Sequence, residues 1–379
     1  MIIGFDAKRA FHNNSGLGNY SRTLIKNLHQ YFPEHEYMLF TPAYKTNHLH
    51  RLVRQSSKIN VITPPEWLPK KLSAVWRTMM MSNSLKSNKV QLYHGLSNEL
   101  PQQIHKTKIP SLVTIHDLIF LRHPEWYPKI DVFFYKAKFK RACQNADIIV
   151  AISEQTKADI IEFYKIKEEK IKVIYQSCDP LFYDLDNMPY RNEVISKYKF
   201  DYPFFFYVGS LNERKNVHVL IDAFAHISEK TDHNLVLVGD GSKHYKDSLN
   251  EQIIKKGLEH RISMFHKVPN DDLPAIYQLA NVFVYPSSYE GFGIPIIEAL
   301  SSKTPVITSE GSCFKETAGP GAVYTKPGDF KSLGEAMYEL SVNDAKQKEL
   351  AENGWQHGQR FYTEKTTKAM NALYKSLIN

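Results

Sequence analysis

Short runs of apolar residues alternate with longer segments of mixed polarity along most of the chain, beginning at the second residue. Apolar runs of about four to eight residues are typical of buried strands, and apolar positions recurring every three or four residues are typical of helices. Regular alternation of the two predicts parallel sheets covered by helices on both faces, with ligands at the carboxyl ends of the strands. The runs predicted as strands are 2–5, 37–40, 90–94, 111–115, 146–152, 173–175, 204–209, 235–239, 262–265, 282–285 and 305–308.

The alternation is interrupted in the segment 178–193 (CDPLFYDLDNMPYRNE), which is polar and contains prolines. We interpret this segment as a linker between two domains, because 379 residues exceed what one ordinary core organises. The predicted fold class is therefore α/β, with two doubly wound parallel sheets. The predicted domains are 1–182 and 183–360, followed by a helix whose apolar periodicity runs from 361 to 377.

The composition, with 42% hydrophobic and 23% charged residues, is that of a soluble globular protein. The three cysteines lack metal-ligand spacing, which favours a reducing compartment over a disulfide framework. Because the sequence shows neither a signal-peptide pattern nor a run of about 18 apolar residues, we expect a cytoplasmic protein. The net charge of +8 favours anionic partners: a nucleotide diphosphate, a phosphorylated lipid or a membrane surface. No nucleic-acid-binding module is recognisable, so nucleic acid is not an expected partner.

One segment, 41–90, is strongly basic, and its single acidic residue is Glu66. Large apolar residues are interleaved with the basic ones, including Trp67, Trp76 and the run Met79–Met81. Basic residues beside large apolar ones are typical of a peripheral contact with the inner face of an anionic membrane. The alternative is a solvated basic face over ordinary packing, with the methionines in the core.

The stretch 282–300 (VFVYPSSYEGFGIPIIEAL) has the pattern of a buried strand, a loop with glycines and a helix that begins near Pro295. Such a junction offers backbone N–H groups and the positive end of a helix dipole to a phosphate. Its carboxylates, Glu290 and Glu298, repel phosphate but accept hydrogen bonds from sugar hydroxyls. The combination predicts a nucleotide-sugar site, in which the loop residues Gly291, Phe292, Gly293 and Ile294 contact the donor.

The two glutamates, with seven residues between them in EGFGIPIIEAL and followed by TPVITS, resemble the signature of the retaining glycosyltransferases of family 4. This resemblance implies the GT-B fold: two Rossmann-like domains facing across a cleft, with the C-terminal helix (361–379) crossing back to the first. It also implies that Glu298 binds the ribose hydroxyls and that Glu290 holds the donor sugar. The sequence departs from the family at 312–316 (SCFKE), where Pro-Glu is common. The alternative for the two carboxylates is a surface loop residue and a solvated helix residue.

Two further segments carry groups suited to a diphosphate. Gly16 and Gly18, in SGLGNYS after the first strand, resemble the family's glycine turn beside the donor diphosphate; a dinucleotide site would need a third glycine and a later carboxylate. Arg214 and Lys215, in VGSLNERKN, precede a helix, where cations have the wrong sign for the dipole and therefore need an anion. This segment resembles the family's diphosphate clamp, with Ser210 where many members carry arginine.

His116 and Asp117 lie in THDLIFLRHPEW, which resembles the family's strongest N-domain pattern, whose histidine contacts the donor sugar. Asp117 either orients His116 or caps the next helix. Ser97 and Asn98, in HGLSN, match a family loop that faces the acceptor. In the family the loop that contains Val268 holds the base, so the base itself stays open.

The resemblance implies a retaining hexosyltransferase with His116 and Glu290 at the donor sugar. Arg214, Lys215 and backbone amides are the groups expected to stabilise charge on the leaving diphosphate. We expect a mannosyl or glucosyl donor (GDP-mannose, UDP-glucose or ADP-glucose), a glycan or lipid-linked acceptor, no cofactor and no metal. Asp184-Leu185-Asp186 spells a D-x-D but lies in the predicted linker. Alternatives are a GT-B sugar-nucleotide epimerase, a non-catalytic nucleotide-sugar or lipid-binding protein, and a phosphorylase-like enzyme that uses pyridoxal phosphate.

Overall fold

The computed structural model describes residues 1–13, 16–46, 49–185 and 188–378, which form two compact units. The first unit is Met1–Gln176 together with the C-terminal segment from Thr363, and the second is Ser177–Tyr362. The units divide a few residues before the predicted boundary at 182/183, because the turn Pro180–Tyr183 packs against helix α13 (Ile294–Ser301) of the second unit.

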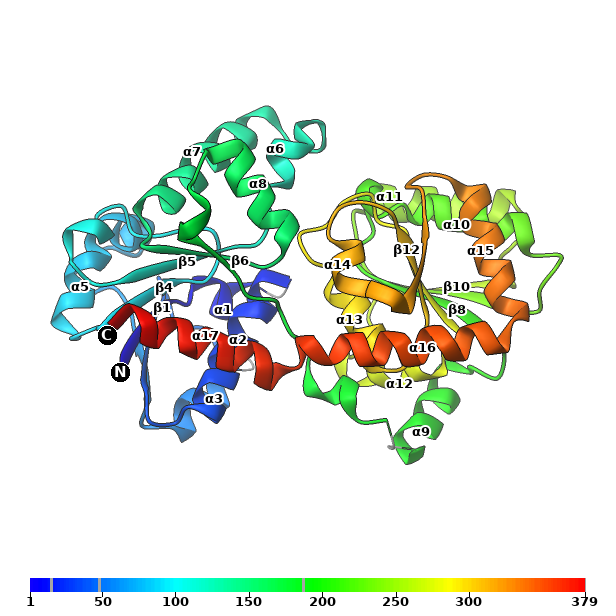
Figure 1. Ribbon diagram of the computed structural model, residues 1–379, viewed down its shortest axis with the longest axis horizontal. Coiled ribbons are helices and arrows are strands. Elements are labelled where there is room, and N and C mark those ends of the chain that lie inside the picture. Colours follow the sequence, from blue (N-terminus) through cyan, green and yellow to red (C-terminus); the bar gives the residue numbers. More distant parts are fainter. Residues whose placement is uncertain (14–15, 47–48, 186–187, 379) are drawn as a thin grey trace. The chain divides into compact units, whose positions relative to one another are not determined.

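The first unit is built around a seven-stranded parallel sheet with helices on both faces (Figure 1). Its strand order is β3-β2-β1-β4-β5-β6-β7, so the chain order reverses between β1 and β4. Strands β4 and β5 are buried along their whole length and β1 along all but its first residue, which explains why they read as nearly continuous apolar runs. The strands are β1 (Ile2–Asp6), β2 (Glu36–Phe40), β3 (Ile59–Ile62), β4 (Leu92–Gly95), β5 (Ser111–Ile115), β6 (Ile148–Ala151) and β7 (Ile171–Val173).

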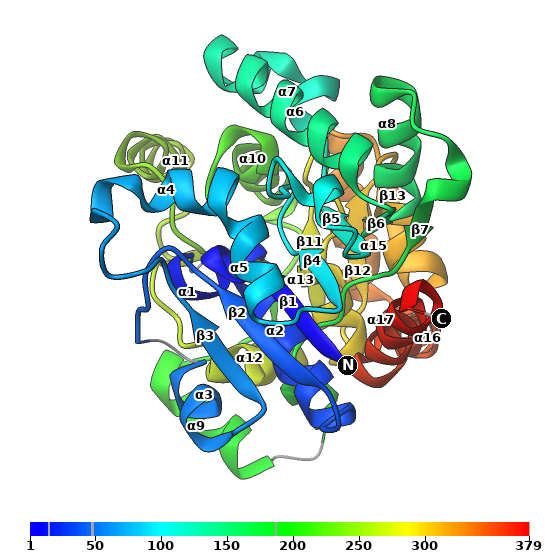
Figure 2. The same ribbon diagram turned by 90° about the vertical axis from the view of Figure 1, so that its left-hand side faces the viewer.

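The helices of this unit differ in length, and Figure 2 shows how they are arranged around the sheet. They are α1 (Lys8–His12), α2 (Gly16–Tyr31), α3 (His50–Gln55), α4 (Ser73–Val75), the π-helical turn η2 (Trp76–Met80), α5 (Met81–Ser87), α6 (Ile119–Arg122), α7 (Lys129–Asn145), α8 (Glu154–Tyr164) and α17 (Thr363–Ile378).

The second unit has a six-stranded parallel sheet of order β10-β9-β8-β11-β12-β13. Its strands are β8 (Phe204–Val208), β9 (Asn234–Val238), β10 (Ile262–Phe265), β11 (Val282–Tyr285), β12 (Val306–Ser309) and β13 (Ala322–Thr325). Its helices are α9 (Met188–Tyr198), α10 (Val217–Ile227), α11 (Lys243–Lys255), α12 (Leu273–Leu279), α13, α14 (Phe314–Ala318), α15 (Phe330–Val342) and α16 (Asp344–Gly358).

The α/β class and the two doubly wound sheets are confirmed, and each predicted strand is present within a few residues of its expected bounds. Two edge strands, β3 and β13, were not predicted, and they are only partly buried. The segment interpreted as a linker contains the turn Pro180–Tyr183 and the start of helix α9. Pro189 stands in the first turn of that helix, where a missing N–H costs nothing.

The terminal helix α17 packs on α2 and β4 of the first unit, as the resemblance implied. Met370 and Tyr374 are fully buried in the same core as Phe5 and Tyr37. The Tyr374 hydroxyl lies 2.7 Å from His94 Nδ1, and Asn371 Oδ1 lies 2.9 Å from His35 Nε2. The last helix is therefore part of the first core, although the second unit separates it in sequence.

Candidate functional site

The clearest cluster of charged groups lies where the strand order of the second sheet reverses. Strand β8 pairs with β9 on one side and with β11 on the other, and such a switch point opens a crevice at the carboxyl ends. The turn after β8 carries Arg214 and Lys215, and the loop after β11 carries Glu290. The topology thus brings together residues that are 75 positions apart.

Glu290 accepts contacts from four side chains, and all of them go to its Oε1 atom. Ser287 Oγ donates at 2.5 Å, Tyr285 OH donates at 3.2 Å, and Arg214 Nη1 lies 2.8 Å away. Lys215 Nζ also donates to this oxygen, and to Tyr285 OH at 2.6 Å. Among the described residues, the side-chain hydrogen bonds to this carboxylate all end on Oε1.

Burial and charge act in opposite directions on this cluster. Burial alone would raise the pKa of Glu290, but Lys215, Arg214 and Ser287 lower it to about 2, so the carboxylate is ionised. Burial lowers the pKa of Lys215 while Glu290 raises it. The side chain of Lys215 is 8% exposed and that of Arg214 is 21% exposed, so a ligand reaches Arg214 more readily. The anion that these cations require is, in this structure, Glu290 itself.

The main chain of the loop that carries Glu290 is held by side chains of helix α14 and the turn before it. Ser312 Oγ donates to Glu290 O at 2.8 Å, and Glu290 N donates back to that hydroxyl at 3.1 Å. Thr317 Oγ1 donates to Phe292 O at 2.7 Å. Gly293, with φ of 99°, is the N-cap of α13, and this left-handed conformation favours glycine. Ser312 belongs to the stretch that departs from the family, and it supports the loop.

Glu298 lies one turn into α13 and is half-buried. Burial raises its pKa, a 2.9 Å hydrogen bond from Tyr277 OH opposes the shift, and nearby Asp179 adds to it, so that the pKa is about 7. The surface-residue alternative is therefore wrong for both glutamates.

Two further residues predicted at the donor site lie in neighbouring loops of the second unit. Ser210 is exposed, and its hydroxyl accepts a hydrogen bond from Asn212 Nδ2 at 3.1 Å. Val268 is half-buried in the loop after β10.

His116, at the end of β5, is buried in the first unit and uses both ring nitrogens. Its Nε2 lies 2.9 Å from Leu96 O, so this nitrogen carries the proton, and its Nδ1 accepts from Gln176 Nε2 at 3.1 Å. The Tyr20 ring lies edge-on, with centroids 4.7 Å apart. Burial lowers the pKa of His116 to about 4, although the Leu96 hydrogen bond opposes this, so the ring is neutral at physiological pH.

The residues predicted beside His116 hold its loop. Asn98 Oδ1 accepts from His116 N at 2.8 Å, and Asn98 has a left-handed backbone with φ of 62°. Asp117 Oδ1 accepts from the backbone N of Ile119, the first residue of α6, at 3.2 Å, and the N-cap position of that helix is Leu118. Ser97 is buried next to Asn98.

The glycine turn differs from the expected loop, because Gly16 and Gly18 already belong to the first turn of α2. Ser15 of this motif lies outside the described residues. Gly18 N donates to Asn13 Oδ1 at 3.2 Å, and a Cβ at Gly18 would lie 1.9 Å from Asn13 O. A Cβ at Gly16 would meet no atom of the described residues within 4 Å. Gly18 is therefore required by packing, whereas Gly16 leaves room for a ligand.

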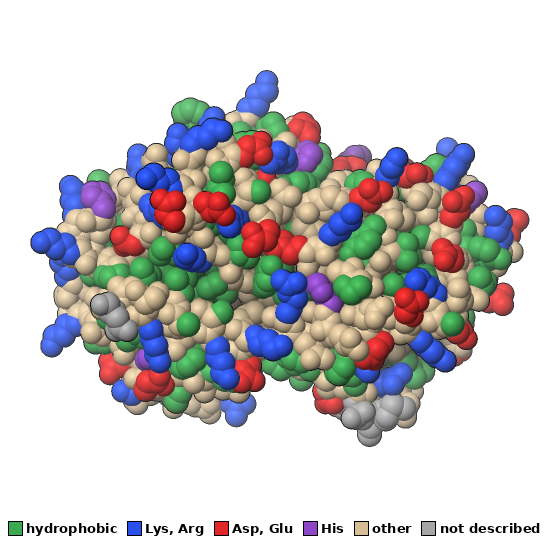
Figure 3. Space-filling model, viewed as in Figure 1, with side chains coloured by type: hydrophobic (Ala, Val, Ile, Leu, Met, Phe, Trp, Pro, Cys, Tyr) green, Lys and Arg blue, Asp and Glu red, His purple; other side chains and the backbone are tan. Residues whose placement is uncertain are grey.

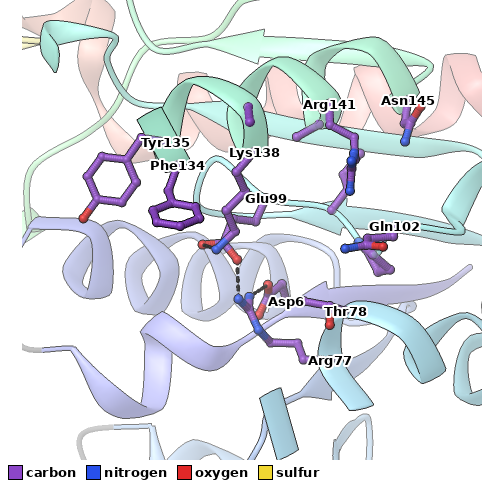
Figure 4. Close-up of a pocket in the computed structure, with 14 residues that line it drawn as sticks. Asp6, Arg77, Thr78, Glu99, Gln102, Phe134, Tyr135, Lys138, Arg141 and Asn145 are labelled. Atoms are coloured by element: carbon purple, nitrogen blue, oxygen red, sulfur yellow. Dashed lines mark hydrogen bonds and ion pairs between the residues drawn. The ribbon is translucent and has the colours of Figure 1, made fainter. Parts of the chain in front are cut away.

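The basic segment 41–90 contains both buried and exposed parts. Trp76, Arg77 and Met81 are buried, whereas Trp67 is 71% exposed and Met79 is 51% exposed. Arg77 is one of the basic residues of this segment, but it is not on an exposed face, because it is buried and forms ion pairs with Asp6 and Glu99 (Figure 4). The sequence analysis did not identify this network of ion pairs. The sequence pattern that could have indicated it is the single aspartate, Asp6, at the end of the first strand.

Two further observations concern metals and membranes. Within the described parts of the chain, no three His, Cys, Asp or Glu side chains cluster in a way that would hold a metal ion; Asp186 of the D-x-D lies outside them. No helix among residues 1–13, 16–46, 49–185 and 188–378 has the length and apolar character needed to cross a bilayer.

Two family models match consecutive parts of the chain. Residues 14–180 match Glycosyltransferase Family 4, and residues 191–357 match Glycosyl transferases group 1. The O-antigen chain mannosyltransferase B of Escherichia coli is 27% identical over 301 residues, which cover 78% of this chain and 76% of that one. The O-antigen chain mannosyltransferase RfbU of Salmonella typhimurium is 32% identical over 230 residues, or 60% of each chain.

Solved structures share the fold. The crystal structure of HepE from Anabaena in complex with UDP-glucose superposes with a TM-score of 0.77 and 20% identity over the full length of both chains. The predicted GT-B class is thus confirmed, with its two Rossmann-like sheets and its C-terminal helix in the first unit. Fold and family models agree: the chain belongs to the glycosyltransferases, with a family 4 domain followed by a group 1 domain.

Proposed function

We propose that this protein transfers a hexosyl group, mannose in the first instance, from a nucleotide diphosphate sugar to a glycan acceptor, with retention of configuration and without a metal ion. The choice of mannose is supported by the O-antigen mannosyltransferases among its relatives. The use of a nucleotide diphosphate donor is supported by the UDP-glucose complex of a protein with the same fold. The observation that carries the proposal is the Arg214–Lys215–Glu290 cluster at the switch point of the second sheet.

Arg214 and Lys215 have different roles in this proposal. Arg214 is the more exposed cation, so it binds the diphosphate and stabilises the negative charge that develops on it during bond cleavage. Lys215 is almost fully buried and remains with Glu290, which fixes the carboxylate. The N-terminal amides of α13 add donors at the positive end of the helix dipole. These groups supply positive charge in place of a metal ion.

The two glutamates bind hydroxyl groups at opposite ends of the donor. Glu290 is ionised and its hydrogen bonds from protein side chains end on Oε1, so we assign Oε2 to a hydroxyl of the transferred sugar. Glu298 accepts hydrogen bonds from the ribose hydroxyls. His116 contacts the donor sugar after Gln176 releases its Nδ1 atom, because both ring nitrogens are otherwise occupied.

A panel of donors tests the proposal. GDP-mannose, UDP-glucose and ADP-glucose are compared by thermal shift with magnesium and with EDTA, and bound donors are then incubated with candidate glycan acceptors. The proposal expects stabilisation that is independent of magnesium, and transfer to a product whose anomeric proton coupling in NMR matches that of the donor. Release of an epimerised sugar would instead indicate an epimerase, and binding without turnover a non-catalytic protein.

A further inference from the structure

The carboxylate of Glu298 has a tyrosine partner that comes from the neighbouring helix α12. Tyr277 OH donates to Glu298 Oε2 at 2.9 Å and to Pro295 O at 3.1 Å. A phenol carries a single hydrogen, so the two acceptors share it. Pro295 lies in the first turn of α13, and Glu298 follows one turn later. The hydroxyl is therefore tied to the end of α13 that the proposed function places at the donor.

The ring of Tyr277 has little freedom to turn away from this carboxylate, because it is fully buried. It meets Phe206 of β8 and Phe283 of β11 with ring centroids 5.0 Å apart in each case. Phe182, in the turn Pro180–Tyr183, packs edge-on against it at 5.6 Å. Aromatic contacts of this kind fix the orientation of a ring. The hydrogen bond to Glu298 is thus set by packing and is present before any ligand binds.

The surroundings of Glu298 favour its neutral form. Carboxylates normally lie in water, as the acidic side chains on the face drawn in Figure 3 do, whereas Glu298 is half-buried. Burial raises the pKa of Glu298, and the hydrogen bond from Tyr277 lowers it. A hydroxyl that donates to a carboxylate stabilises the charged form, because the neutral acid is a weaker acceptor. Tyr277 therefore opposes the effect of burial.

Other groups that face Glu298 come from the start of the second unit. Asp179 is exposed, its Oδ1 accepts from Leu181 N at 3.1 Å, and its negative charge raises the pKa of Glu298. Cys178 Sγ donates to Ile297 O at 3.9 Å, and burial raises the pKa of this thiol to about 12, so it is neutral. Among the described residues of α14, α16, β11 and β12, which also pack on α13, none carries a charge that shifts the pKa of Glu298.

We infer that Tyr277 is a positioning residue of the donor site: it fixes the carboxylate of Glu298 and stabilises its charged form, which accepts hydrogen bonds from both hydroxyls of a ribose. Asp179 acts in the opposite direction, because a nearby negative charge favours the neutral acid. The balance of the two sets the pH above which the protein binds a nucleotide diphosphate tightly. This role rests on the proposed function and adds the control of its donor site by pH.

Calorimetric titration of GDP and UDP into the full-length protein, at pH values from 6 to 9, tests this role. The nucleotide that binds more tightly to the wild type is then used for the variants. Tyr277→Phe keeps the ring and removes the hydrogen bond, so the midpoint of the rise in affinity should move to higher pH by about half a unit or more. Its affinity should be about two- to threefold weaker than that of the wild type at pH 7 and equal to it at pH 9, where the carboxylate is ionised in both proteins.

A second variant should move the midpoint in the opposite direction. Asp179→Asn removes the negative charge, so the rise in affinity should occur at lower pH than in the wild type. Asparagine keeps the oxygen that accepts from Leu181 N, so the turn is retained. Because Asp179 is exposed, this shift should disappear in about 1 M salt, whereas the shift of Tyr277→Phe should persist. Opposite shifts in two variants cannot come from a general loss of stability.

Tyr37→Phe is the matched control for the loss of a buried hydroxyl. Tyr37 is also fully buried, and its hydroxyl donates to two carbonyl groups of the first unit, Leu28 O and Phe32 O. This variant should keep the affinity and the midpoint of the wild type. A Tyr277→Phe protein whose midpoint is that of the wild type, including one whose affinity falls by the same factor at every pH, would overturn the role of Tyr277 alone. A wild type that binds neither nucleotide would overturn the proposed function, and this role with it.

Discussion

Lys215 and Glu290 form a buried ion pair that joins the carboxyl ends of β8 and β11. The pair is supported by Arg214, Tyr285 and Ser287, so the carboxylate is held ionised inside the protein. This ion pair therefore positions the loop that bears Glu290 before any donor binds.

Removing one member of this pair should be costly. Glu290→Gln leaves the Lys215 ammonium buried without its counter-charge, so we expect the free energy of unfolding to fall by about 3 kcal/mol. Urea denaturation followed by tryptophan fluorescence measures the loss. The double variant Lys215→Met/Glu290→Gln should recover part of it, because no buried charge remains. A Glu290→Gln protein as stable as the wild type would show that the pair does not hold the loop.

The low pKa of Glu290 also predicts the direction of acid sensitivity. The carboxyl is ionised in the folded protein down to a pH of about 2, whereas in the unfolded chain it takes up a proton near its ordinary value of 4.5. Its contribution to stability is therefore present above pH 4.5 and is lost as the pH falls from 4.5 towards 2. The difference in stability between wild type and Glu290→Gln should shrink over that window in urea titrations at stepped pH.

Glu298 should give nucleotide binding a dependence on pH near neutrality. Its pKa is about 7, and only the ionised carboxylate accepts hydrogen bonds from both ribose hydroxyls. Nucleotide affinity should therefore rise as the pH increases from 6 to 8, by about tenfold at most if this bond is worth about 1.4 kcal/mol. Calorimetry on Glu298→Gln, which cannot ionise, should give a flat profile; a profile as steep as the wild type would remove Glu298 from the ribose site.

The two glycines at the start of α2 should respond differently to alanine. A Cβ at Gly18 would overlap Asn13 O, so Gly18→Ala should lower the free energy of unfolding by about 1–3 kcal/mol. Gly16→Ala meets no atom within 4 Å and should be neutral or slightly stabilising, while weakening donor turnover if the diphosphate approaches there. Steady-state kinetics and thermal unfolding of both variants distinguish packing from ligand contact. Unchanged turnover in Gly16→Ala would remove this turn from the donor site.

The contribution of the terminal helix can be measured at one hydroxyl. Tyr374→Phe removes the partner of His94 Nδ1 in a fully buried setting, so we expect a loss of about 1–3 kcal/mol in the free energy of unfolding. Tyr338→Phe, on the exposed surface of α15, is the matched control and should change it little. Equal stability of the two variants would mean that the buried hydroxyl contributes nothing.

The sequence was sufficient to predict most of the fold because its central strands are buried on both faces and read as unbroken apolar runs. The strands that it did not reveal, β3 and β13, lie at sheet edges, where polar and apolar residues mix. Helix α9 was hidden in a polar segment whose proline, at 189, starts a helix instead of ending one.

The site was predictable to the extent that short motifs mark the ends of parallel strands. The motif around Glu290 and the pair Arg214–Lys215 were found separately, but their direct pairing spans 75 residues and leaves no local pattern. The partners of His116 were likewise hidden, since Gln176 is 60 residues away and Leu96 contributes only its carbonyl group. Contacts made by the backbone carry no signal in residue type.

The claim that Arg214 binds the donor diphosphate can be tested by calorimetric titration of GDP and UDP into wild-type protein and Arg214→Ala. Arg214 is partly exposed and Lys215 remains to neutralise Glu290, so the variant should fold normally. We predict that the nucleotide that binds more tightly to the wild type loses about 10-fold or more in affinity, as for a lost charge-assisted contact to phosphate. Equal affinity in the two proteins would contradict the proposed donor site.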